Sequence, residues 1–121
     1  MSIKRDEVEK IIEANHFART RATKKVVEYR SERSGKVFYF RKDIGLPIYV
    51  RIVTHPNQDV STLLALDGVV QNPQKEFQHG SNMMAFPKEV HEGKEEIHFG
   101  RALNIDSLAA LTAFSSTFHH I

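Results

Sequence analysis

The feature that most constrains the fold is a set of three segments in which apolar and polar residues alternate. They are TKKVVEYRSE at 23–32, KVFYFRK at 36–42 and IYVRIVT at 48–54. A period of two is typical of strands that are buried on one face. A glycine-containing turn, ERSG, joins the first two segments, and KDIGLP separates the second from the third. The pattern therefore predicts three consecutive antiparallel strands in meander order.

The same alternation assigns the side chains of the second and third strands to two faces of the sheet. The face expected to pack against helices carries Phe38, Phe40, Ile48, Val50 and Ile52. The opposite face carries Tyr39, Arg41, Tyr49 and Arg51. We expect this second face either to meet solvent and a partner, or to be covered by the C-terminal part of the chain.

Amphipathic helices are predicted at both ends of the chain. In the segment 2–17, Val8, Ile11 and Ile12 recur at three- and four-residue spacing, and the segment 104–121 carries a similar apolar stripe. The stripe consists of Leu108, Leu111, Phe114 and Phe118. We predict one α+β domain spanning 1–121, with a single antiparallel sheet of four to five strands packed by an N-terminal and a C-terminal helix.

The middle of the chain carries weaker signals. VSTLLALDGVV, at 60–70, fits either a strand or a helical turn, and the following segment is rich in Asn, Gly and Pro, as loops are. We expect one short strand near 84–86 and another at IHFG, 97–100, joined across the turn at Glu92 and Gly93.

Composition restricts the class of protein. The 121 residues include no cysteine, which removes disulfides, thiol nucleophiles and cysteine-bound metals and fits a reducing compartment. The N-terminal segment has no apolar core of a signal peptide, and no apolar run approaches the length of a membrane span. We expect a cytoplasmic protein with no contact to membrane.

Charge is distributed unevenly along the chain. The net charge is only +2, but residues 19–51 carry ten Lys or Arg against three Asp or Glu, a local charge of +7. Residues 52–121 carry a net −4. A basic third within a nearly neutral protein indicates an acidic partner, because opposite charge steers association.

Motifs for catalysis are missing from the sequence, so we expect neither enzymatic activity nor a cofactor. No glycine-rich phosphate loop, nucleophile elbow or paired-histidine zinc motif occurs. His91 and His98 flank the turn EGKEE, where Glu92 and Glu96 would also suit a divalent metal. Solvated turn histidines are the simpler interpretation, and we predict no metal site.

The residues expected to bind a partner are Tyr39, Arg41, Tyr49, Arg51, Arg30 and Arg33. We expect a non-catalytic protein-binding module of immunity type, which neutralises a toxin domain through a complementary charged surface. The alternative is a protein that binds single-stranded nucleic acid, because arginines neutralise phosphates and tyrosines stack on bases. The oligomeric state is left open.

Several short motifs occur in one order along the chain. They are KRDEVEKIIEANHF, YVRIVTHP, ST-L, FP, IHFG and SLAAL, and they extend from about Lys4 to Phe118. In this order the chain resembles the YgaC-like family, small bacterial proteins of cytoplasmic type whose function is uncharacterised. The chain departs from the family in a longer segment between Ser61 and Phe86, and in Phe99 where the family tends to have Tyr. The resemblance implies an α+β fold and supplies no catalytic residues.

Overall fold

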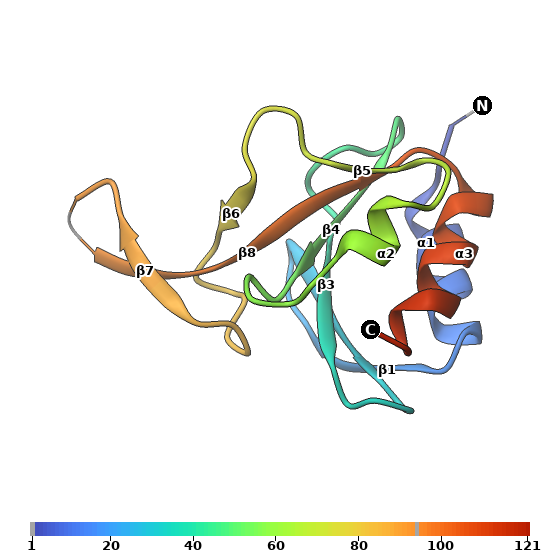
Figure 1. Cartoon of the computed structure of the whole chain (residues 1–121), viewed down its shortest axis with the longest axis horizontal. Coiled ribbons are helices and arrows are strands. Elements are labelled where there is room, and N and C mark those ends of the chain that lie inside the picture. The colour runs from blue at the N-terminus through green and yellow to red at the C-terminus, as the bar shows by residue number, and fades with distance from the viewer. Residues whose placement is uncertain (1, 94) are drawn as a thin grey trace.

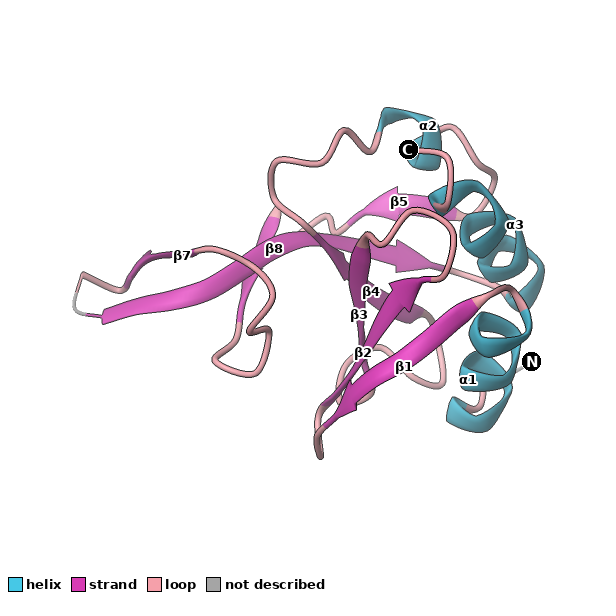
Figure 2. Cartoon of the chain, turned by 90° about the horizontal axis from the view of Figure 1, so that it is seen from below, coloured by secondary structure: helices cyan, strands magenta, loops and turns pink. Residues whose placement is uncertain are grey.

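A twisted antiparallel sheet with helices on one face forms the body of the protein (Figures 1 and 2). The computed structural model describes residues 2–93 and 95–121. In chain order the elements are α1 (Arg5–Ala14), β1 (Phe17–Ala22), β2 (Val26–Ser31), β3 (Val37–Arg41), β4 (Val50–Thr54), α2 (Ser61–Leu64), β5 (Val69–Gln71), β6 (Phe77–His79), β7 (Lys88–His91), β8 (Glu95–Ile105) and α3 (Leu108–Phe118). This is the predicted α+β class, with a helix near each end.

The sheet is organised around β8, which spans 11 residues. The strand order is β1-β2-β3-β4-β8-β5, and β6 and β7 also pair with β8. The predicted meander of β2, β3 and β4 is confirmed. The predicted number of four to five strands is wrong, because the sheet has eight among the described residues. Strands β1 and β6 were not predicted, and β5 lies in the run that fitted either a strand or a helical turn; β5 and β6 have only three residues each, and β1 lacks the alternation that marks β2 and β3.

The main core lies between one face of the sheet and the helices α1 and α3. The ring of Phe38 lies at its centre, with centroids 4.9 Å from Phe17, 5.3 Å from Phe114 and 5.0 Å from Phe118. Edge-to-face pairs of this kind add to the free energy gained from apolar burial. The predicted core residues Phe38, Phe40, Val50 and Ile52 are fully buried. Ile48, predicted to join them, is 77% exposed, because it lies in the turn before β4 begins at Val50.

The end of α3 is attached to the rest of the body by His119. The imidazole Nε2 lies 2.6 Å from the carbonyl oxygen of Asn15, and Nδ1 lies 2.5 Å from Oγ of Ser31. The ring also stacks on Phe17, with centroids 4.4 Å apart. A buried histidine with both nitrogens hydrogen-bonded connects α1, β2 and α3.

The segment between β4 and β8 contains both kinds of structure. The ambiguous run 60–70 forms the short helix α2 and then strand β5. The strand predicted near 84–86 is wrong, since these residues form turns and the strand lies at Lys88–His91. The predicted turn at Glu92 and Gly93 does join two strands, β7 and β8, and both residues have positive φ.

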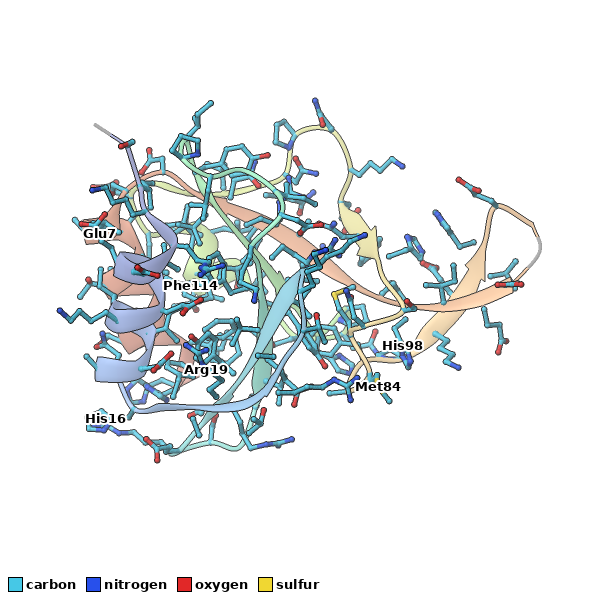
Figure 3. All side chains as sticks on the ribbon, turned by 180° about the vertical axis from the view of Figure 1, so that it is seen from behind. Glu7, His16, Arg19, Met84, His98 and Phe114 are labelled. Atoms are coloured by element: carbon cyan, nitrogen blue, oxygen red, sulfur yellow. The ribbon has the colours of Figure 1, made fainter. Side chains whose placement is uncertain are left out.

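The hairpin of β7 and the first part of β8, residues 88–93 and 95–98, is called the arm. It extends away from the helices, at the end of the body opposite to α1 and α3 (Figure 1). Figure 3 places Met84 and His98 at the foot of the arm, far from Glu7 on α1. Among the described residues, no helix has the length and apolar character that crossing a membrane requires.

Candidate anion-binding cleft

The sheet face that was predicted to carry the binding residues is covered over much of its area. Tyr39 is fully buried, and Arg41 and Arg51 are 7% and 5% exposed. The cover comes from the segment before β7. Met83 and Phe86 pack on the sheet in a second, smaller cluster, made of Val26, Tyr39, Val53, Met83 and Phe86. Alternation placed Tyr39, Arg41 and Arg51 on one face, and of the two alternatives left open for that face, the one in which the C-terminal part of the chain covers it applies to these three residues.

Tyr39 has a structural role under this cover. Its hydroxyl donates to a carboxylate oxygen of Glu28 and accepts a hydrogen bond from the backbone N–H of Ala85, at 3.0 Å. Burial, and then the neighbouring Glu28 carboxylate, raise the pKa of Tyr39 above its usual range. The ring is therefore not available to stack on a ligand.

Arg41 is a buried cation whose guanidinium has one carboxylate partner. Its Nε and Nη2 donate to the two carboxylate oxygens of Asp43 at 3.1 and 3.0 Å. Burial opposes ionisation of Asp43, but the hydrogen bond and charge of Arg41 outweigh it and hold the pKa of Asp43 below its usual range. Nη1 of Arg41 is buried and has no hydrogen-bond partner among the described residues. A Cβ built at Gly80 would lie only 3.0 Å from this Nη1, so the covering segment runs directly against the guanidinium.

Arg51 is buried, and none of the described carboxylates is its hydrogen-bond or ion-pair partner. Its Nε donates to Oδ1 of Asn104 at 2.9 Å, its Nη1 to Oε1 of Gln78 at 2.7 Å, and its Nη2 to the hydroxyl of Tyr49 at 3.2 Å. No ion pair of Arg51 occurs within residues 2–93 and 95–121. Burial lowers the pKa of the guanidinium, which nevertheless stays charged at neutral pH.

The guanidinium of Arg51, which has no carboxylate hydrogen-bond partner among the described residues, lies against an open cleft of about 380 Å³, called the Arg51 cleft. The cleft is lined by Ile44, Tyr49, Arg51, Asn72, Gln74, Lys75, Phe77, Gln78, His79 and His91. The lining contains two permanent cations, two imidazoles and three side-chain amides, and no carboxylate. Buried charges in proteins are normally paired, because leaving water is costly for an ion. The arrangement therefore suits an anionic group that enters from solvent and supplies the missing charge.

The rim of the cleft is formed where the arm folds against β6. The rings of His79 and His91 stack with centroids 4.0 Å apart, and Nε2 of His79 lies 2.9 Å from a carboxylate oxygen of Glu89. His98 is not part of this contact, since its Nδ1 lies 2.7 Å from the carbonyl oxygen of Phe86. Within the described residues no group of three or more His, Cys, Asp or Glu could hold a metal ion.

The six predicted residues thus do not form one site. Tyr49 and Arg51 line the cleft and Arg41 lies buried on the same face, whereas Tyr39 is enclosed. Arg30 is exposed near the other end of β2 and donates from Nη1 to the carbonyl oxygen of Gly35 at 2.7 Å. Arg33 is exposed in the turn between β2 and β3.

The sequence interpretation missed most of the cleft. Besides Ile44 and His91, the lining residues that it did not assign to a partner site are Asn72, Gln74, Lys75, Phe77, Gln78 and His79. They come from a segment without hydrophobic periodicity, and only its pairing with β8 brings it to the cleft. The one available signal was compositional, because this loop-like segment carries several amides, a lysine and a histidine close together.

A scan against protein-family models finds no match for the chain, and a search of curated proteins finds none either. The resemblance to the YgaC-like family therefore stays a prediction from sequence.

Proposed function

We propose that the protein is a non-catalytic binding protein that holds an acidic group of a protein partner in the Arg51 cleft. The observation that carries this proposal is Arg51 itself, which is 95% buried against an open cleft and whose hydrogen-bond partners among the described residues are all neutral. A carboxylate entering the cleft would pair with Arg51 in a partly desolvated site, where charge-assisted hydrogen bonds are strong.

The surroundings of the cleft support a protein as the partner. Two large apolar side chains, Ile48 and Val70, are 77% and 54% exposed; Ile48 directly precedes the cleft residue Tyr49, and Val70 precedes Asn72 by two positions. Exposed apolar side chains beside a charged pocket are typical of protein interfaces, whereas nucleic-acid interfaces are more uniformly polar and positive.

The specific form of this proposal is an immunity-type inhibitor that neutralises a toxin domain. The local charge of +7 over residues 19–51 supports it, because such a region would steer an acidic partner toward the cleft. The product of a neighbouring gene is the first partner to test.

Binding of single-stranded nucleic acid is the second candidate. It is favoured by Tyr49 and Phe77, which line the cleft beside Arg51 and Lys75 and would let a base stack next to a bound phosphate. The cation of Arg51 already lies over the ring of Tyr49, with Cζ 5.6 Å from the ring centroid. With Tyr39 enclosed, the stacking surface is smaller than the sequence indicated.

Pull-down with tagged protein and co-expression with the neighbouring gene product test the first candidate. Wild type is compared with Lys75→Glu, an exposed charge reversal in the cleft lining, and with Arg51→Gln. Arg33→Gln is the matched control, because Arg33 is exposed in a turn that does not line the cleft.

We expect one protein to co-purify in stoichiometric amount with wild type and with Arg33→Gln, and not with Lys75→Glu. A partner retained equally by Lys75→Glu and Arg51→Gln would contradict the assignment to the cleft. Binding of labelled single-stranded RNA or DNA to the same variants is measured in parallel. Salt-dependent binding that is lost with Lys75→Glu would favour the second candidate.

A further inference from the structure

A second pocket, called the His55 pocket, lies on the same covered face of the sheet and shares no lining residue with the Arg51 cleft. Its volume is about 440 Å³. The lining residues are Arg30, Lys36, Val37, His55, Asn57, Gln58, Ala85 and Phe86. They come from β2, from the start of β3, from the turn after β4 and from the covering segment before β7.

One part of the His55 pocket is apolar and rigid. The ring of Phe86 is only 4% exposed and is held edge-on by Tyr39 and His55, with centroids 4.9 and 5.6 Å away. Val37 and Ala85 extend this apolar surface. A fixed aromatic ring beside aliphatic side chains is suited to contact with a flat apolar group of a ligand.

The remaining part is cationic and rich in hydrogen-bond donors. Arg30 and Lys36 are exposed cations, Nζ of Lys36 donates to the carbonyl oxygen of Ile121, and no carboxylate side chain of the described residues lines the pocket. Nε2 of Gln58 is buried and has no hydrogen-bond partner among the described residues. Since a buried donor without a partner lowers stability, a ligand acceptor that reaches Gln58 would gain a hydrogen bond that the free protein lacks.

The neighbouring histidine has an orientation fixed by the backbone. Nδ1 of His55 accepts a hydrogen bond from the N–H of Asn57 at 3.1 Å. That bond assigns the ring proton to Nε2, so His55 adds a further donor to the pocket. The donors of Arg30, Gln58 and His55 thus lie around one apolar wall.

We propose that the His55 pocket binds a small aromatic anion, with its ring against Phe86 and its anionic group toward Gln58 and Arg30. The class includes aryl phosphates and aryl carboxylates, which share a flat apolar body and one anionic group. This site goes beyond the proposed function, because it uses a different pocket and a small ligand.

The experiment is an NMR titration of ¹⁵N-labelled full-length protein with phenyl phosphate. The readouts are the side-chain amide signals of Gln58 and the backbone amides of Val37 and Phe86. Inorganic phosphate and benzyl alcohol are titrated separately, since the first has only the anionic group and the second only the ring. Arg30→Gln tests the pocket, and Arg33→Gln and Lys75→Glu are controls outside it.

The expected result is saturable shifts with phenyl phosphate, at least fivefold weaker binding in Arg30→Gln, and unchanged binding in the two controls. Equal affinity for inorganic phosphate would overturn the aromatic part of the proposal. Equal affinity for benzyl alcohol would overturn the anionic part. No shift of the Gln58 side-chain amide at millimolar phenyl phosphate would overturn the site as a whole.

Discussion

Raising the pH above 10 is expected to destabilise this protein through two buried tyrosines, Tyr29 and Tyr39. Both side chains are fully buried, and their hydroxyls donate to the carboxylates of Glu13 and Glu28 respectively. Burial, and then the adjacent carboxylate, raise the pKa of each phenol well above its usual value of about 10.

The sign of the effect follows from proton binding. Above pH 10 the unfolded chain loses the protons of both tyrosines while the folded state retains them. The unfolded state then binds fewer protons, so the free energy of unfolding falls as the pH rises. At pH 11 each tyrosine contributes a loss of about 1.4 kcal/mol, and the pair about 3 kcal/mol. That is a large fraction of the 5–15 kcal/mol typical of a domain.

Urea unfolding followed by circular dichroism at pH 8 and pH 11 measures this loss. The double variant Tyr29→Phe/Tyr39→Phe is expected to be less stable than wild type at pH 8, because it lacks three hydrogen bonds of the two hydroxyls, each contributing about 1 kcal/mol. Between pH 8 and pH 11 it should lose about 3 kcal/mol less than wild type, and each single variant about half of that difference. Lysine titration affects all variants alike and cancels. If wild type and the double variant lost equal stability, the reasoning from burial would be refuted.

Three further changes test the packing described above, each by urea unfolding at neutral pH. Phe38→Ala removes the ring at the centre of the core and should lower the free energy of unfolding by about 3–5 kcal/mol, whereas a loss under 1 kcal/mol would show that the ring is not a central contact. His119→Ala leaves Ser31 without its buried partner and should cost about 1–3 kcal/mol, with Ser31→Ala similar and the double variant less than additive; full additivity would contradict their hydrogen bond. Asp43→Asn removes the carboxylate beside Arg41 and should cost about 1–3 kcal/mol, while unchanged stability would mean that the pair contributes nothing.

The sequence was informative where neighbouring residues decide the structure. Alternation correctly separated Phe38 from Tyr39 and Ile52 from Arg51, because the period of a strand fixes the two faces of a sheet. It also located the terminal helices and the Glu92–Gly93 turn, whose signals are local.

The sequence left open whether the second sheet face is covered, and it did not indicate which residues cover it. Met83 and Phe86 reach Tyr39 from more than forty positions away, and they lie in a segment with no period. Arg51 is likewise hydrogen-bonded to residues that are far away in the sequence, namely Gln78 in β6 and Asn104 in β8. Predicting the cleft would have required knowing which segment lies on this sheet face. The position of that segment depends on the pairing of β6 and β7 with β8.

Local opening, measured by amide exchange, is expected to differ between the two ends of strand β8. Its last residues, around Leu103 and Ile105, lie between β4 and β5 in the core, whereas its first residues pair with β7 alone in the arm. Amide exchange should therefore form a gradient along one strand, slow at Leu103 and fast at Glu96, because a two-stranded hairpin opens far more readily than a packed sheet. A partner that binds the arm would slow amide exchange in the first residues of β8, so that protection would extend from the core to the exposed end of the strand.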